Sequence, residues 1–285
     1  MRYIHLRFPE GKEKALTLSY DDGVVYDKRL AEITKKYGIK ITFNINSSFI
    51  GADKGRLTLE EIKELDAMDH VEIATHGENH RAPGRVTKIQ GITDTLMCRR
   101  TLEKELGKII RGMAYPDSGI RLTNCDITKE EVKDYLKDLG IAYARTLGGD
   151  NNHFLLPNDW YEWMPTAHHN NPEMMKYLKE FLDMPTPRYG SSQVPRLFYL
   201  WGHSYEFEND NNWELIEEFC KVASNNPNVW YATNIEICDY VNAYYSLVYS
   251  ADETMVYNPT LFDIWFSADG KTYKIKPGET LKFEE

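Results

Sequence analysis

The sequence predicts an α/β fold in which parallel strands form a sheet that is closed, or nearly closed, into a (β/α) barrel, with a small C-terminal β extension. Strand-like and helix-like segments alternate along most of the 285 residues. Such alternation implies parallel strands joined by right-handed helical crossovers. The tail from residue 256 to 283 changes to a strand, turn, strand pattern. We therefore expect a barrel domain over residues 1–250 and a β-hairpin extension over residues 251–285.

The first strand–helix–strand unit has clear boundaries in the sequence. Residues 14–19 (KALTLS) form an apolar-leaning strand, and Leu30 and Ile33 give residues 26–37 the spacing of an amphipathic helix, which ends before Gly38. Residues 39–45 (IKITFNI) are rich in β-branched and aromatic side chains and so favour a strand.

The same alternation continues downstream. Thr58 and Glu61 have the spacing of a capping box, which predicts a helix over residues 58–68. The remaining predicted strands are residues 71–74, 113–115, 141–145, 196–201 and 229–232, and the remaining predicted helices are residues 87–106, 129–139, 214–223 and 235–245. In the tail, LFDIWFSADGKTYKI has the pattern of a hairpin with its turn at Ala-Asp-Gly.

Composition excludes several classes of partner. A net charge of −10 disfavours binding to nucleic acid or to an anionic membrane surface. No stretch approaches the roughly 18 apolar residues of a membrane-spanning helix. The N-terminal segment lacks the apolar core of a signal peptide, so we expect a cytoplasmic protein, or a secreted one if a leader had been removed. The oligomeric state is not predicted.

The cysteines give no sign of a structural metal site. The four of them are far apart and form no Cys-x-x-Cys pair, which argues against structural zinc and against a disulfide framework. They are Cys98, Cys125, Cys220 and Cys238.

Two polar motifs follow predicted strands. SYDDG places Asp21 and Asp22 side by side, which suits a turn but also suits a site where a cation relieves their repulsion. THGENH places His76 and His80 at i and i+4, on one face if the segment is helical. Strand ends meet on one rim of a barrel, and two imidazoles with one carboxylate bind a divalent ion. The second carboxylate would then be free to act as a base.

A third strand end carries His203, in the segment FYLWGH. If His203 faces the metal from across the barrel, it could protonate a leaving group. The alternative is a core histidine hydrogen-bonded to the backbone.

SYDDG, THGENH, AYPDSG and YLWGHSYEF together are similar to the ordered motifs of the NodB-type polysaccharide deacetylases, carbohydrate esterase family four, over about residues 15–240. The resemblance implies a distorted (β/α) barrel that removes acetyl groups from sugars with a divalent metal, usually zinc. By that match Asp21 resembles the catalytic base, and Asp22, His76 and His80 resemble the metal ligands.

The resemblance also assigns a groove. Tyr115, Pro116 and Asp117 match the third motif, in which the backbone N–H at Asp117 would help to hold the oxyanion. Commoner family members carry an arginine before the prolines that orients the base. Tyr115 stands there in this chain, so Arg145, at another strand end, is the candidate to orient Asp21.

In the last motif, Trp201 replaces the leucine that lines the acetyl pocket, two residues before the catalytic acid His203. Residues 157–163 lie where the family places a tryptophan and an aspartate that support the site. Asp159 and Trp163 are the candidates for these two supporting residues, with Trp163 and Trp201 lining the groove.

The expected activity is hydrolysis of an acetyl group from a carbohydrate, either the N-acetyl amide of an amino sugar or the O-acetyl ester of xylan. The expected cofactor is one divalent ion, zinc first, with cobalt, nickel or manganese as alternatives. Two other functions remain open: a deacylase of non-sugar amides, and a non-catalytic carbohydrate-binding protein on a degenerate deacetylase scaffold. His168 and His169, before two asparagines, are expected to cap a helix rather than to bind metal.

Overall fold

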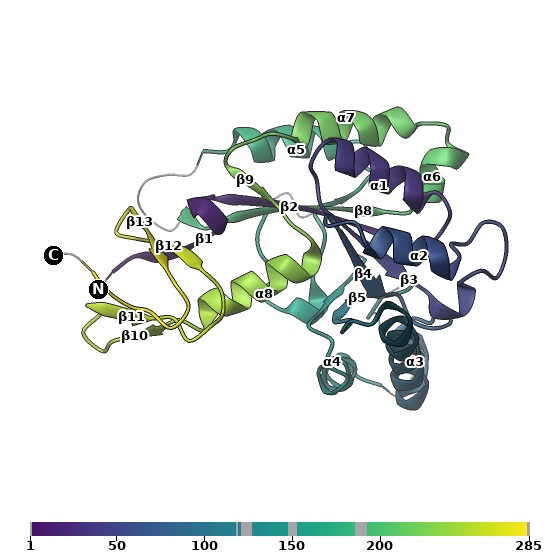
Figure 1. Ribbon diagram of the computed structural model, residues 1–285, viewed down its shortest axis with the longest axis horizontal. Coiled ribbons are helices and arrows are strands. Elements are labelled where there is room, and N and C mark those ends of the chain that lie inside the picture. The colour runs from purple at the N-terminus through teal and green to yellow at the C-terminus, as the bar shows by residue number, and fades with distance from the viewer. Residues whose placement is uncertain (1, 118, 121–126, 148–152, 186–192, 284–285) are drawn as a thin grey trace.

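The central feature of the computed structural model is a curled parallel sheet, which Figure 1 shows running through the middle of the molecule. The structure describes residues 2–117, 119–120, 127–147, 153–185 and 193–283. Seven strands follow the order β6-β5-β4-β3-β2-β8-β7, and β9 also pairs with β2. Their bounds are β2 Lys14–Asp21, β3 Ile41–Ile45, β4 Val71–Thr75, β5 Gly112–Ala114, β6 Tyr143–Arg145, β7 Ala167–His168, β8 Arg196–Gly202 and β9 Val229–Tyr231.

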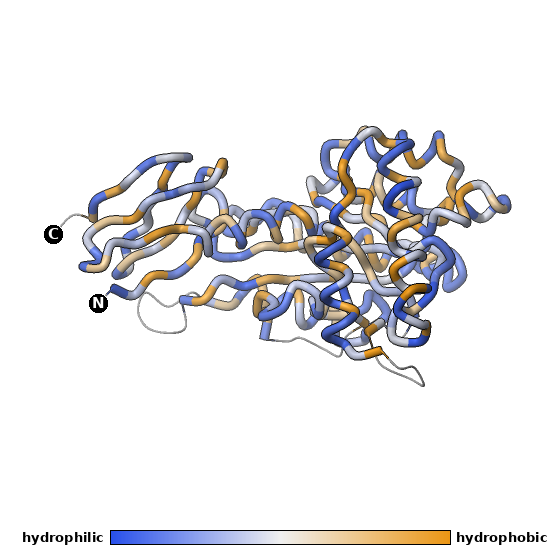
Figure 2. Tube along the Cα trace, turned by 90° about the horizontal axis from the view of Figure 1, so that it is seen from below, coloured by the Kyte–Doolittle hydropathy of each residue, from blue (hydrophilic) through white to orange (hydrophobic). Residues whose placement is uncertain are grey.

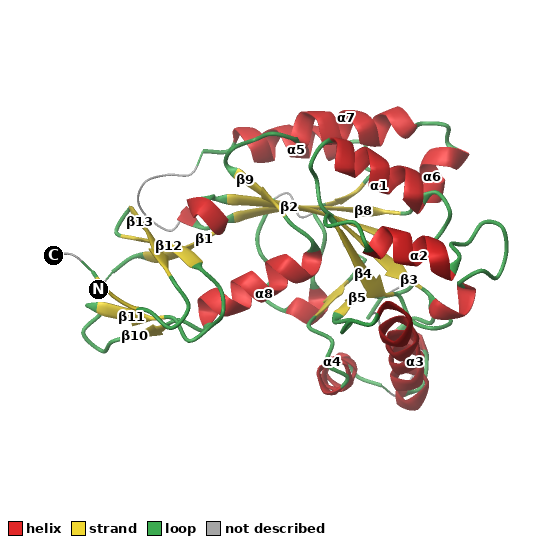
Figure 3. Cartoon of the chain, in the orientation of Figure 1, coloured by secondary structure: helices red, strands yellow, loops and turns green. Residues whose placement is uncertain are grey.

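Helices pack around the outside of this sheet, as Figure 3 shows in red. They are α1 Asp27–Lys36, α2 Leu59–Asp66, α3 Lys88–Leu106, α4 Lys129–Asp138, α5 Met174–Asp183, α6 Ser204–Asn209, α7 Trp213–Ala223 and α8 Asn234–Tyr245. The predicted capping box is present, because the Thr58 side chain accepts from the N–H of Glu61. No helix in the described ranges is long and apolar enough to span a membrane.

The two edges of the sheet come together through one short segment. Trp163 forms a single parallel bridge with Arg145 of β6. A few residues later, Ala167 pairs with Leu200 of β8. The segment between them therefore joins the first and last strands, and the expected distorted (β/α) barrel is confirmed.

Strand β2 is buried along its whole length. All eight of its residues are buried, because β3 and β8 pair with it on either side and helices cover it. Cys98, Cys220 and Cys238 are buried free thiols, as the spacing predicted, whereas Cys125 lies outside the described residues.

The C-terminal part of the chain forms two small antiparallel sheets at one end of the molecule, where both termini lie (Figure 2). The predicted hairpin is present as β12 and β13, and the N-terminal strand β1 pairs with β12. The second sheet has the order β10-β11-β14. Their bounds are β1 Ile4–Arg7, β10 Val248–Tyr249, β11 Met255–Tyr257, β12 Ile264–Ala268, β13 Lys271–Ile275 and β14 Thr280–Lys282. The division of the chain at residue 250 stays a prediction.

Candidate active site

The SYDDG turn separates its two carboxylates at the end of β2. Asp22 and Gly23 both have positive φ, 85° and 61°, so the chain reverses over two left-handed residues. A side chain at Gly23 would also come within 3.1 Å of Ile45. The N–H of Asp22 donates to the carbonyl oxygen of Asn44 at 3.0 Å. The segment is therefore a turn, and the turn aims Asp21 and Asp22 at different partners.

Asp21 lies in a buried pocket of hydrogen-bond donors. The residue is 1% exposed, and its carboxylate pairs with the guanidinium of Arg145, which is itself fully buried. The side-chain amide of Asn44 donates to Oδ1 of Asp21 at 2.8 Å. Burial opposes ionisation, but the guanidinium of Arg145 holds the pKa of Asp21 below its ordinary value. The predicted contact between Arg145 and Asp21 is thus present.

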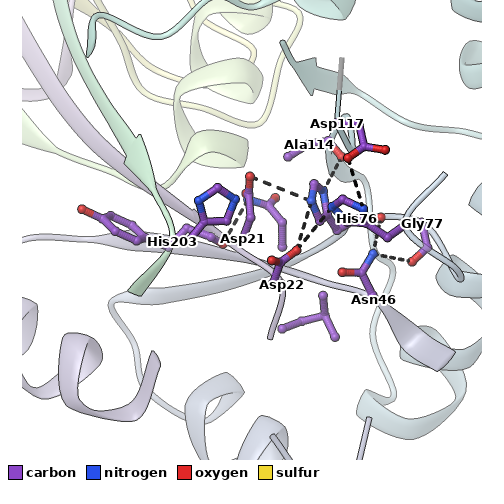
Figure 4. A network of polar contacts seen from close by, with 12 residues as sticks. Asp21, Asp22, Asn46, His76, Gly77, Ala114, Asp117 and His203 are labelled. Carbon is purple, nitrogen blue, oxygen red and sulfur yellow. Dashed lines mark hydrogen bonds and ion pairs between the residues drawn. The ribbon is translucent and has the colours of Figure 1, made fainter. Parts of the chain in front are cut away.

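Asp22, His76 and His80 converge on one point, and Figure 4 shows the carboxylate of Asp22 facing His76. Oδ1 of Asp22 is 3.6 Å from Nε2 of His76 and 3.5 Å from Nε2 of His80. Although that oxygen is buried, it has no hydrogen-bond partner among the described residues. A buried carboxylate oxygen without a donor is costly unless a cation binds it.

The protonation of His76 suits a metal ligand. Its Nδ1 lies 2.8 Å from the carbonyl oxygen of Ala114. Because a carbonyl only accepts, Nδ1 carries the proton and the lone pair of Nε2 faces Asp22. Burial also lowers the pKa of His76, which keeps the ring neutral. Two neutral imidazoles and a carboxylate fit zinc, cobalt, nickel or manganese.

THGENH does not meet the condition of being helical, because this segment is an irregular loop after β4. Gly77 and His80 have φ values of 78° and 54°, which no helix contains. Oδ1 of Asp94, in α3, accepts from the N–H of Asn79 at 2.8 Å. The Asn46 amide donates to the carbonyl oxygens of His76 and Gly77. These contacts, rather than helical spacing, bring the ring centroids of His76 and His80 to 4.8 Å from each other.

Gly77→Ala is expected to weaken zinc binding and to destabilise the fold. A Cβ there would collide with Oδ2 of Asp94, and the positive φ alone costs about 1–2 kcal/mol. Gly38→Ala is the matched control, since Gly38 has a φ of 65° and open space around it. Calorimetric zinc titration and chemical denaturation of both variants measure the two effects. Equal zinc affinity in the two variants would contradict this account of the loop.

His203 begins α6, directly after β8, and lies beside Asp21 in Figure 4. Burial opposes its protonation, but Glu206, Asp21 and Asp22 together raise the pKa of His203 above its ordinary value. The ring of Trp201 lies under the guanidinium of Arg145, 4.4 Å from its centroid. Trp201 therefore helps to fix the arginine that pairs with Asp21.

The third motif lies differently from what the resemblance implied. Tyr115 is fully buried and its hydroxyl donates to the carbonyl oxygen of Tyr161 at 3.0 Å, and Pro116 is buried too. A groove role for the Tyr115 side chain is wrong, because no substrate could reach it. Asp117 is exposed, and its Oδ1 lies 3.7 Å from Nδ1 of His80. It therefore borders the candidate metal site.

The two supporting candidates need correction. Trp163 is 1% exposed and packs against Tyr143 and Tyr199, so its side chain cannot line a groove. Asp159 is not brought to His203. Its carboxylate binds Lys133 at 2.7 Å and caps the turn at Trp160–Glu162. Three side chains that lie in or behind the site were not predicted from the sequence: Asn44, Asp94 and Glu206. Only Glu206 had a signal in the sequence, because it follows His203 by three residues.

The fold and the site define an α/β-barrel protein with a candidate metal centre at the carboxyl ends of its strands. The polysaccharide deacetylase family model matches residues 9–144, which carry SYDDG, THGENH and AYPDSG. Over these residues the chain is similar to the polysaccharide deacetylase family, as the motifs indicated. No curated protein sequence matches the chain.

Several solved structures share the fold. A putative polysaccharide deacetylase from Mycobacterium smegmatis is 15% identical, with a TM-score of 0.57 over 84% of this chain and 94% of its own. A mutant of BA3943, a CE4 family pseudoenzyme with restored activity, is 16% identical, with a TM-score of 0.51 over 81% and 69%. A 4-alpha-glucanotransferase from Thermococcus litoralis is 12% identical, with a TM-score of 0.57 over 80% and 40%.

These likenesses establish the fold alone, and the barrel serves proteins described as deacetylase, pseudoenzyme and glucanotransferase. The chain spans 55% of the length of the Streptococcus pyogenes deacetylase PplD. The activity of this chain must therefore be argued from its own residues.

Proposed function

We propose that the protein is a hydrolase that uses one divalent metal ion, zinc first, to remove acetyl groups from a carbohydrate. One observation carries the proposal. The buried Oδ1 of Asp22 lacks a hydrogen-bond partner among the described residues and faces Nε2 of His76 and of His80, beside a second carboxylate that Arg145 keeps ionised. Similarity to the family over residues 9–144 supports the acetylated-carbohydrate substrate.

Asp22, His76 and His80 would hold the metal. A divalent cation there would act as a Lewis acid, which lowers the pKa of a water and polarises the acyl carbonyl. Asp21 would take a proton from the attacking water. Its Oδ2 faces Arg145 and its Oδ1 faces Asn44, so the carboxylate is fixed in place before the reaction begins.

The second proton transfer falls to His203. His203 lies beside Asp21 and would donate a proton to the leaving nitrogen or oxygen. The N–H of Asp117 would help to stabilise the oxyanion. Trp201 would act through Arg145, which it packs against.

The substrate class is open to direct measurement. We expect the zinc-loaded protein to release acetate from N-acetylated chitooligosaccharides or peptidoglycan fragments, or from acetylated xylan, and the responding substrate separates amide from ester chemistry. A set of non-sugar amides, including cyclic ureides, serves as the comparison. Stoichiometric zinc with no acetate released from any glycan would contradict the proposal and favour a non-catalytic binding protein.

A further inference from the structure

One carboxylate oxygen in this molecule faces three imidazole rings. Oε2 of Glu206 lies 3.2 Å from Nε2 of His168, 3.2 Å from Nε2 of His169 and 3.4 Å from Nδ1 of His203. Glu206 comes from the first turn of α6, and it also accepts from the backbone N–H of His203 at 3.2 Å. His203 is the N-cap residue of α6, so the Glu206 carboxylate lies against both the backbone and the ring of the proposed catalytic acid.

Two histidines and a carboxylate in one cluster raise the question of a second metal site. The protonation of His168 decides against it. The backbone N–H of Asn170 donates to Nδ1 of His168 at 3.1 Å. A nitrogen that accepts a hydrogen bond carries no proton, so Nε2 of the neutral ring carries it. Nε2 of His168 therefore points a proton, not a lone pair, at Glu206.

His169 is held in a fixed, dry position. It is 1% exposed, stacked between Tyr20 at 5.7 Å and Phe207 at 4.1 Å between ring centroids. Nδ1 of His169 lies so close to Gly202 that a Cβ atom added at Gly202 would collide with it. Burial lowers the pKa of His169 to about 3, so the ring is neutral and Nε2 is the nitrogen turned to Glu206.

We propose that Glu206 is a positioning residue, which fixes His203 with a proton on Nδ1, so that Nε2 is the atom that exchanges a proton with the substrate. His168, whose Nε2 carries a proton, and the buried His169 both lie 3.2 Å from this carboxylate. The inference rests on the proposed function, in which His203 is the acid.

The charged groups around His203 and Glu206 agree with this arrangement. His203 faces three carboxylates, those of Glu206, Asp21 and Asp22, together with the ring of Tyr205. Burial opposes the ionisation of Glu206, but the nearby imidazoles of His168 and His203 hold its pKa well below its ordinary value. Loss of the Glu206 charge removes a group that raises the pKa of His203, so that pKa falls. At neutral pH less of the acid would then be protonated.

The test compares Glu206→Gln with Glu208→Gln. Both residues are glutamates in α6, but Glu208 accepts from Trp213 at 2.8 Å and lies 3.9 Å from Arg29. In Glu206→Gln we expect kcat for acetate release at pH 7 to fall by about 10²-fold with KM unchanged. The alkaline limb of its pH–rate profile should move to lower pH. Glu208→Gln should keep the wild-type values, and Glu206→Asp, which keeps the charge, should recover part of the loss.

The direct readout is the histidine nitrogen NMR spectrum of the zinc-loaded protein, titrated from pH 5 to 9 and assigned with His203→Asn. We expect neutral His203 to carry its proton on Nδ1 in the wild type, and its pKa to be lower in Glu206→Gln. The same tautomer and pKa in both proteins would overturn the inference. So would a second equivalent of Zn²⁺ that the wild type binds and Glu206→Gln does not. These spectra decide the inference even if no substrate releases acetate, so its failure is distinguishable from failure of the proposed function.

Discussion

Asp21→Asn is expected to lower kcat for acetate release by about 10² to 10⁴-fold while the protein still binds one equivalent of Zn²⁺. Asp21 is the proposed base, and its carboxylate is 1% exposed between Arg145 and Asn44. An amide of the same shape can still accept from Asn44, but it has no basic oxygen to take a proton. The proposed metal ligands are untouched by the change.

The substitution leaves the buried charge of Arg145 without its carboxylate, which destabilises a fold by about 3–5 kcal/mol. Zinc stoichiometry and the unfolding transition must therefore be measured beside turnover. A folded Asp21→Asn protein with one bound zinc and wild-type turnover would show that Asp21 is not the base.

In Asp22→Asn, by contrast, we expect zinc binding to be lost together with activity. The affinity for Zn²⁺ should fall by more than the roughly 10 to 100-fold that the loss of an outer-shell partner costs, because the charged ligand itself is removed. Asparagine is the suitable replacement, since Asp22 has a φ of 85° and asparagine tolerates that region. The neighbouring variants thus carry the same chemical change and control for each other.

Zinc affinity by competition with a chromophoric chelator measures the difference. If Asp22→Asn kept wild-type affinity while Asp21→Asn lost it, the roles of the two carboxylates would have to be exchanged. If neither variant changed affinity, the metal would lie elsewhere.

Much of the barrel could be predicted because its strands and helices are locally encoded. Residues 14–19 and 39–45 were expected as strands and form β2 and β3, since buried parallel strands require continuous apolar and β-branched runs. Helix α5 and the two-residue strand β7 were not predicted. Strand β7 depends on pairing with β8 rather than on its own composition.

The candidate site, like the barrel, could be predicted only in part. Asp21, Asp22, His76 and His80 could be selected from motifs, because their residue types state their chemistry. Their geometry could not be predicted, since THGENH is held as a loop by Asp94 of α3, a contact that no local pattern indicates.

The supporting residues depend on tertiary structure. Asp159 matched a family position by sequence order, yet Lys133 takes its carboxylate, and Glu206 stands against His203 instead. Arg145 was expected to orient Asp21 because it lies at another strand end, but the contact itself depends on how β6 is placed beside the barrel interior. Side chains that meet from distant strands have no fixed spacing in the sequence from which their contact could be predicted.

The most direct test of the central claim is metal reconstitution of acetate release. The protein is stripped with a chelator, assayed on the substrate to which the untreated protein responds, and assayed again after one equivalent of Zn²⁺ is returned. We predict that activity is lost on stripping and restored by that single equivalent in the wild type, but not in Asp22→Asn. Full activity in the stripped wild type, or recovery in Asp22→Asn equal to that of the wild type, would contradict a metal-dependent reaction at Asp22, His76 and His80.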